Sequence, residues 1–146
     1  MPENAQDSRP RQQALIVKTS SLGDLFHAMP AAWSLQRGLP ADMDWVVNEE
    51  YADLIRGFAA VRRVIPFPRR RFRHGAAAFW RALPRVEYDL VADLQGLQRS
   101  ALIARAARAR RRVGPSFCRE GAGGWFRELA GPKNKQRHAV EECPDT

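Results

Sequence analysis

This chain of 146 residues has only two cysteines, Cys118 and Cys143, with no C-x-x-C spacing and no nearby histidine pattern. A zinc site and a disulfide framework are therefore not expected. No apolar run approaches the roughly 20 residues that span a bilayer. The polar start, "MPENAQDSRPRQQ", lacks the apolar stretch of a signal peptide. We expect a soluble, cytoplasmic protein.

Lysine is also scarce. Three of the 24 basic residues are lysines, which leaves 21 arginines against 16 acidic residues and a net charge of +8. Arginines cluster in "RRRFR" at 69–73 and "RARRR" at 108–112, patches that suit the phosphates of nucleic acid, lipid or sugar. The chain shows no helix-turn-helix, zinc-finger or RNP-like aromatic pattern. A nucleic-acid-binding or non-catalytic phosphate- or sugar-binding module is the alternative function.

Apolar strand-like runs alternate with helix-like segments after residue 13. Strands are predicted at 14–17, 43–48, 61–67, 88–94 and 111–115. Helices are predicted at 31–39, 49–58, 76–83 and 98–110, with one helical turn at 125–130. This alternation predicts an α/β fold, a Rossmann-like parallel sheet with helices on both faces. We divide the chain into a disordered leader (1–13), one domain (14–142) and a tail (143–146).

The segment "KTSSLGD" at 18–24 directly follows the first predicted strand. Its spacing is not that of a P-loop. A turn of this composition gathers N–H and hydroxyl groups that suit an anionic or sugar ligand. The same residues also fit a capping box, with Ser21 as N-cap and Asp24 three residues later. Other polar residues share its edge of the sheet, where ligands of such folds bind. They are Asn48, Glu49, Arg69 to Arg73, Asp93, Gln95 and Gly96.

Five stretches together resemble the ADP-heptose:lipopolysaccharide heptosyltransferases of glycosyltransferase family 9, specifically the heptosyltransferase I type. They are "VKTSSLGDLFHAMPA", "DWVVNEEYADL", "VRRVIPFPRRRFR", "YDLVADLQGLQRSALIARAAR" and "RHAVEE". The resemblance implies the N-terminal domain of a GT-B glycosyltransferase, and it covers that half only. It implies transfer of heptose from ADP-heptose to the Kdo of lipid A, with inversion, in the synthesis of the lipopolysaccharide inner core.

The resemblance also implies roles for individual residues. Asp24 matches the family's general base, a role for which inverting transfer needs one carboxylate. The implied substrate-binding residues are Lys18, Thr19, Ser20, Ser21, Gly23, Arg69, Arg70, Arg71, Arg73, Gln95, Gly96, Arg99 and Arg119. For Lys18 a solvated strand-end lysine is an equal alternative, and for the arginines a basic surface loop.

The implied partners are Kdo-lipid A, held by this half, and ADP-heptose, held mainly by a C-terminal donor domain that this sequence lacks. Neither a metal nor another cofactor is expected, nor is nucleic acid a partner. The acceptor leaves open a peripheral contact with the cytoplasmic face of the inner membrane. By itself the chain is expected to be inactive.

Overall fold

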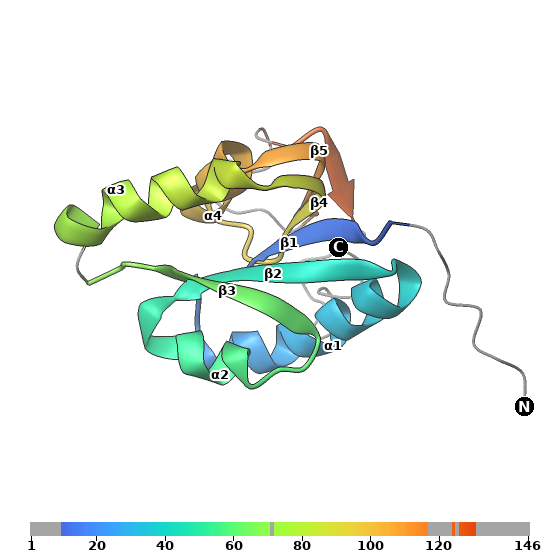
Figure 1. Ribbon diagram of the computed structural model, residues 1–146, viewed down its shortest axis with the longest axis horizontal. Helices are drawn as coiled ribbons and strands as arrows, with labels where there is room; N and C mark the ends of the chain where they lie inside the picture. The colour runs from blue at the N-terminus through green and yellow to red at the C-terminus, as the bar shows by residue number, and fades with distance from the viewer. Residues whose placement is uncertain (1–9, 71, 117–123, 125, 131–146) are drawn as a thin grey trace, which may run out of the picture.

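The strands lie in the sheet in an order that differs from their order in the chain. The computed structural model describes residues 10–70, 72–116, 124 and 126–130. Within them, six parallel strands form one sheet in the order β3-β2-β1-β4-β5-β6 (Figure 1). The strands are β1 (Gln12–Val17), β2 (Ala41–Asn48), β3 (Val61–Phe67), β4 (Glu87–Asp93), β5 (Arg108–Pro115) and β6 (Glu128–Ala130). This order is that of a doubly wound sheet, so the predicted fold class is confirmed.

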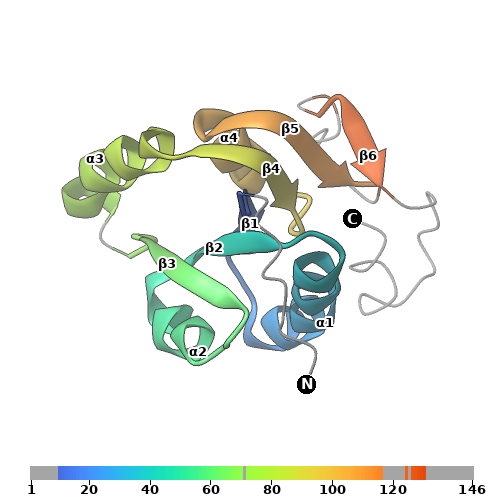
Figure 2. The ribbon, with the colours of Figure 1, turned by 45° about the vertical axis from the view of Figure 1, so that its right-hand side comes forward.

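Helices cover both faces of this sheet. Helices α1 (Leu22–Gly38) and α2 (Ala52–Arg56) lie on one face, and α3 (Phe72–Ala82) and α4 (Gln98–Ala106) on the other (Figure 2). Two 3-10 turns, Glu49–Tyr51 and Leu83–Arg85, precede α2 and β4. The chain leaves each strand at the same edge of the sheet, because the strands are parallel. The loops at that edge therefore come together.

Alternate residues of β1 pack into two separate apolar cores. Leu15 and Val17 pack on the side of α3 and α4 with Phe79 and Ile103, whereas Ile16 packs on the side of α1 and α2. All three β1 side chains are fully buried. A strand covered on both faces must be apolar throughout, which is why "ALIV" carries no alternation. This buried strand gives the loop after Val17 a rigid base.

Trp45 of β2 connects the core of the sheet to the loop that follows β1. Its ring is fully buried and meets Phe58 edge to face, with the ring centroids 6.3 Å apart. Its indole Nε1 donates a hydrogen bond of 3.1 Å to the carbonyl oxygen of Lys18. A buried indole N–H requires such a partner, so the core fixes the first residue beyond β1.

Helix α1 is longer than the sequence predicts. It begins at Leu22, well before the predicted start at residue 31, and Pro30 lies inside it. The cap at Ser21 and Asp24 starts the helix early. Pro30 is exposed there. "KTSSLGD" therefore runs into the helix that carries Pro30.

The prediction is wrong in two places near the end of the described chain. Helix α4 ends at Ala106, and residues 108–110, predicted as helix, begin β5. The helical turn predicted at 125–130 is absent from its described residues, and Glu128–Ala130 form β6 beside β5. Pairing with a neighbouring strand overrides the helix preference of an Ala- and Arg-rich segment. Residues 131–146, including the predicted tail, lie outside the described residues.

Candidate functional site

The candidate site lies where the loops after β1, β2, β3 and β4 meet. Strand β1 is central here, since Val17 pairs with Val46 of β2 on one side and with Asp93 of β4 on the other. The chain runs from β1 towards β2 and β3, and later returns on the opposite side of β1 as β4. Such a reversal point is where doubly wound folds place their ligands. The loops after β1 and β4 form its two sides.

Lys18 is buried, with 7% of its surface exposed. Its ammonium group donates a hydrogen bond of 3.0 Å to the carbonyl oxygen of Leu94, in the loop after β4. The solvated strand-end lysine considered from the sequence is therefore wrong. Lys18 joins the two loops, and its positive charge acts on the carboxylates near it.

The side chain of Gln95 also joins the two loops. Its Oε1 accepts hydrogen bonds from the backbone N–H groups of Thr19 and Ser20, at 3.2 and 3.3 Å. The N–H of Asn48 donates to the carbonyl oxygen of Thr19 at 3.0 Å. The sequence suggested that these N–H groups face a ligand, but the structure satisfies them internally. Their role here is to hold the loop that leads to Asp24.

Asp24 lies in the first turn of α1. Its Oδ2 accepts hydrogen bonds from the backbone N–H of Ser21 at 3.1 Å and from the Ser21 hydroxyl at 3.0 Å. The capping interpretation is thus confirmed. Partial burial acts to raise the pKa of Asp24, but the Ser21 N–H, the charge of Lys18 and the Ser21 hydroxyl outweigh it and leave the pKa below its usual value. Asp24 is therefore an anion at neutral pH.

Asp93 is a second carboxyl group at this edge; the sequence placed it there but assigned it no catalytic or binding role. Its Oδ1 accepts from the N–H groups of Gln95 and Gly96 at 2.8 and 3.3 Å, and its Oδ2 from the Ser100 hydroxyl at 2.8 Å. Gly96 has a φ of 72°, which glycine adopts at little cost. Burial raises the pKa of Asp93 to about 6, although these donors and Lys18 act to lower it. Its place at the end of a strand was the available signal.

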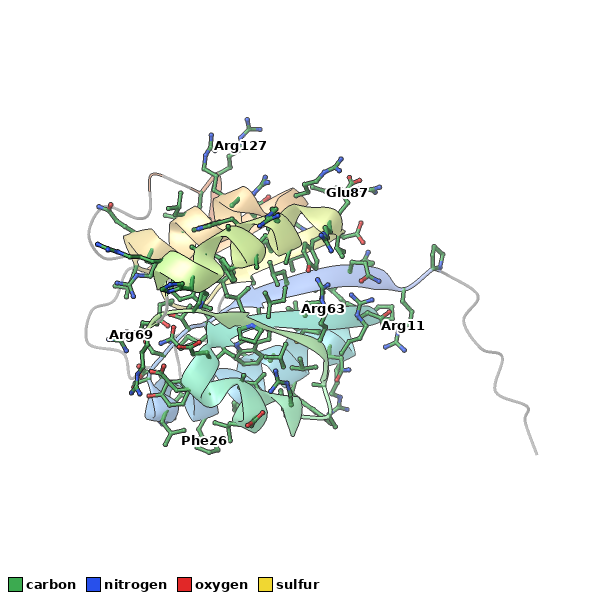
Figure 3. The ribbon with its side chains drawn as sticks, turned by 60° about the vertical axis from the view of Figure 1, so that its left-hand side comes forward. Arg11, Phe26, Arg63, Arg69, Glu87 and Arg127 are labelled. Atoms are coloured by element: carbon green, nitrogen blue, oxygen red, sulfur yellow. The ribbon has the colours of Figure 1, made fainter. Side chains whose placement is uncertain are left out.

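The predicted basic residues are placed only in part. Arg69, Arg70 and Arg73 are exposed beyond β3, whereas Arg71 and Arg119 lie outside the described residues. Figure 3 shows Arg69 towards the opposite end of the sheet from Arg63 and Arg11. The structure brings Arg69 together with Arg99 at one pocket, although the two residues follow different strands. Gly23 lies in the first turn of α1, next to Asp24.

Within the described part of the chain, no three His, Cys, Asp or Glu side chains are grouped so that they could hold a metal ion. The expectation of a reaction without metal or cofactor stays a prediction. The helices in the same residues are all too short or too polar to cross a membrane.

Comparisons with known proteins agree with this arrangement. The sequence profile of glycosyltransferase family 9 (heptosyltransferase) matches residues 76–144. Lipopolysaccharide heptosyltransferase 1 of Escherichia coli (strain K12) is 39% identical over 141 residues, covering 88% of this chain and 44% of that protein. The Pseudomonas aeruginosa protein of the same name is 42% identical over 103 residues, covering 64% of this chain and 29% of that protein.

Solved structures show the same relation. Escherichia coli heptosyltransferase WaaC with ADP has a TM-score of 0.80 and 40% identity, with 90% of this chain and 44% of that chain covered. Escherichia coli ADP-heptose lps heptosyltransferase II, at 22% identity and a TM-score of 0.72, shares the fold. The chain thus spans less than half the length of the relatives it matches.

Proposed function

We propose that this chain is the acceptor-side domain of an inverting heptosyltransferase of glycosyltransferase family 9. The sugar is heptose, the donor ADP-heptose and the acceptor the Kdo of lipid A. The observation that carries the proposal is Asp24, an anionic carboxylate at the ligand-binding edge of a doubly wound sheet. Since lipid A is a membrane lipid, we place the domain at the cytoplasmic face of the inner membrane.

In the proposed reaction, Asp24 accepts the proton of the acceptor hydroxyl as its oxygen attacks the anomeric carbon of heptose. The bond from that carbon to the donor phosphate breaks at the same time, and ADP leaves with the electron pair. Attack opposite to the leaving group inverts the anomeric centre. Both Ser21 bonds reach Oδ2 of Asp24, so Oδ1 is the oxygen that would receive the proton.

The low pKa of Asp24 makes it a weak base in the free domain. A bound acceptor would cover the carboxylate, and loss of water raises the pKa of a carboxyl group. Substrate binding therefore strengthens the base at the moment it is needed. Lys18, whose ammonium is anchored on Leu94, limits that rise and keeps the carboxylate ionised until the proton arrives.

The exposed arginines after β3 supply the proposed grip on the acceptor. Arginine binds carboxylate and phosphate through paired hydrogen bonds, and Arg69, Arg70 and Arg73 form a basic edge within reach of solvent. Arg71 completes this basic loop in the sequence. ADP-heptose is assigned mainly to the C-terminal part that the longer relatives have, so the chain alone is expected to turn over no ADP-heptose.

The test is Asp24→Asn in this chain fused to the C-terminal domain of the Escherichia coli relative. Asparagine keeps the oxygen that caps α1 but cannot accept the proton. Turnover should fall by roughly 10² to 10⁴, the usual contribution of a general base, with acceptor affinity little changed. Asp53→Asn is the matched control, because the Asp53 side chain is 96% exposed on α2, and its turnover should stay normal.

Thermal stability measured on the same proteins separates the two roles of Asp24. A purely structural cap predicts a stability loss of about 1 kcal/mol or less with normal turnover. Normal turnover in Asp24→Asn would therefore exclude Asp24 as the base. Binding to duplex DNA as tight as binding to Kdo-lipid A at matched salt would favour the nucleic-acid alternative instead.

A further inference from the structure

The loop from β1 to α1 is held from one side by β2. The N–H of Lys18 donates to the carbonyl oxygen of Val46 at 3.2 Å, and the carbonyl oxygen of Lys18 accepts from the Trp45 indole at 3.1 Å. The carbonyl oxygen of Thr19 accepts from the N–H of Asn48 at 3.0 Å. These contacts come from the backbone of β2 or from a fully buried ring. They therefore belong to the core and cannot be changed without disturbing it.

From the other side the loop is held by a single side chain, that of Gln95. Its Oε1 accepts from the backbone N–H groups of Thr19 and Ser20 at 3.2 and 3.3 Å. Two N–H donors require an acceptor, which fixes the oxygen end of the amide, and an amide oxygen can accept two such bonds. Gln95 is half-buried. One replaceable side chain thus binds the two residues that lead into the cap formed by Ser21 and Asp24.

Gln95 is in turn held in place by α4. The Oδ1 of Asp93 accepts from the N–H groups of Gln95 and Gly96 at 2.8 and 3.3 Å, and its Oδ2 accepts from the Ser100 hydroxyl at 2.8 Å. Asp93 and Ser100 are both buried. A row of hydrogen bonds therefore runs from Ser100 in α4, through Asp93 and Gln95, to the loop after β1.

We propose that Gln95 is a positioning residue of the transfer reaction, which fixes the loop after β1 so that Oδ1 of Asp24 faces the acceptor hydroxyl. The inference rests on the proposed function. Both Ser21 donors bind Oδ2 of Asp24, so the direction of Oδ1 depends on where the loop places Ser21. Ser21 directly follows Ser20, which Gln95 binds. This role replaces the substrate contact that the family resemblance implies for Gln95.

The first test is Gln95→Met in the fused enzyme described above, because methionine has a similar length but no amide oxygen. With both substrates saturating, kcat should fall about 10- to 100-fold, the usual cost of a reacting group displaced by about 1 Å. The KM for the acceptor should stay within about twofold. The acid limb of the pH profile of kcat should not move, because burial, Ser21 and Lys18, which together set the pKa of Asp24, are unchanged.

Gln95→Glu is the conservative variant that should restore the rate. Glutamate keeps an oxygen at the same distance but has no N–H to offer a substrate. On the high-pH plateau its kcat should lie within about threefold of the unmodified enzyme. Its charge should move the acid limb to higher pH, because a nearby anion raises the pKa of Asp24. A higher acceptor KM with unchanged kcat in both variants would overturn the proposal, since that is the result of a direct substrate contact.

Gln36→Met is the matched control. Gln36 is a half-buried glutamine on α1, and its Nε2 donates to the carbonyl oxygen of Ala60 at 3.3 Å. This variant also loses a glutamine that connects two segments, but it should keep a normal kcat. Thermal stability measured on all three variants shows whether each is folded at the assay temperature. Equal kcat losses in Gln36→Met and Gln95→Met would mean that Gln95 acts only through stability.

The second test needs no activity and uses the full chain of 146 residues. Amide hydrogen exchange followed by NMR should be at least about tenfold faster at Thr19 and Ser20 in Gln95→Met, because both N–H groups lose their acceptor. Exchange at Lys18, whose N–H is bound by Val46, should not change. Unchanged exchange at Thr19 and Ser20 would show that Gln95 does not hold the loop.

The two tests separate this inference from the proposed function. If Asp24→Asn abolishes transfer in the fused enzyme while Gln95→Met keeps its kcat, the positioning role is wrong and the function stands. If the fused enzyme transfers no heptose although Gln95→Met exchanges faster at Thr19 and Ser20, the heptosyltransferase proposal fails and Gln95 has only a structural role in this loop.

Discussion

Asp44 in β2 and Asp93 at the end of β4 are both 0% exposed, yet their carboxylates are stabilised in opposite ways. Asp44 accepts hydrogen bonds from two arginines of β3. Arg62 reaches Oδ1 and Oδ2 at 3.0 and 3.1 Å, and Arg63 reaches Oδ2 at 3.1 Å. The Tyr88 hydroxyl donates to Oδ2 at 2.8 Å. Burial, together with the bond to Asp44, raises the pKa of Tyr88 and keeps it a donor.

Asp93 is bound by neutral donors instead: two backbone N–H groups and the Ser100 hydroxyl. The ammonium of Lys18 acts on it from a distance but donates its hydrogen bond to Leu94. At the end of the sheet near Arg63, two arginines are thus paired with the buried carboxylate of Asp44 (Figure 3). At the end near Arg69, the buried carboxylate of Asp93 is held by the neutral donors named above. The arginines after β3 are therefore not bound by Asp93, and Arg69 has instead a partly exposed pair with Glu50 at 3.7 Å from Nη1 to Oε1.

The largest expected effect comes from removing the carboxylate that holds two arginines. Asp44→Ala leaves Arg62 and Arg63 adjacent without a counter-charge and leaves the buried Tyr88 hydroxyl without its acceptor. We expect the free energy of unfolding to fall by about 3–5 kcal/mol, as for other broken buried ion pairs. Urea denaturation followed by circular dichroism measures it.

Asp42→Ala is the matched control for Asp44. Asp42 lies two residues earlier in β2, is partly exposed, and pairs with Arg11 at 3.0 Å from Nε to Oδ1. Exposed pairs contribute about 1 kcal/mol or less. Equal losses for the two variants would show that Asp44 is no more structural than a surface carboxylate, and the comparison with Asp93 would lose its basis.

The next effect is a pH dependence that belongs to Asp93. Its pKa is about 6 in the folded chain against an ordinary value of 3.8, so the folded state binds the proton more tightly than the unfolded state. The stability that this proton contributes is present below pH 3.8 and is lost as the pH rises to about 6. A pKa difference of about 2 corresponds to about 3 kcal/mol.

Asp93→Asn keeps the acceptor oxygen but cannot ionise. Between pH 4 and 7, the unmodified chain should therefore lose stability relative to this variant, by up to about 3 kcal/mol. Urea denaturation at a series of pH values measures the difference, with Asp53→Asn as the exposed control. Parallel stability curves for the unmodified chain and Asp93→Asn would mean that Asp93 ionises in the fold as it does in water.

The sequence predicted which residues lie at the edge of the sheet where the strands end, but not which of them contact one another. Strand ends follow from apolar runs, and the cap from Ser21 and Asp24 three residues apart, because both depend on local spacing. That Arg69 and Arg99 line the same pocket depends on which strands become neighbours. The order of strands in a sheet is not encoded locally. The contacts of Asp44 could not be predicted either, because the two arginines that bind it lie in a later strand. The start of β5 at Arg108 could not be predicted because it depends on pairing with β4. That pairing overrides the local preference for helix.

The smallest effect concerns the Tyr88 hydroxyl, a neutral donor to Asp44. Tyr88→Phe keeps the ring in the core but removes the hydroxyl that donates to Asp44 and accepts from Arg63 at 3.0 Å. Because two arginines still hold Asp44, the unfolding free energy should fall by only about 1 kcal/mol. Tyr51→Phe, a half-buried tyrosine on the other face of the sheet, is the control and should change little.

Ser100→Ala removes the hydroxyl that donates to Asp93, as Tyr88→Phe removes the one that donates to Asp44. The two variants together therefore compare the two buried carboxylates directly. Within the described part of the chain no arginine pairs with Asp93, and the Ser100 hydroxyl acts to lower its pKa. Ser100→Ala should therefore raise the pKa of Asp93 further and move the pH-dependent loss of stability to higher pH, whereas Tyr88→Phe should leave that profile in place. Denaturation of both variants at pH 5 and pH 7 measures this. A loss in Tyr88→Phe as large as that in Asp44→Ala would mean that a hydroxyl, rather than two guanidinium groups, stabilises the buried carboxylate at that end of the sheet.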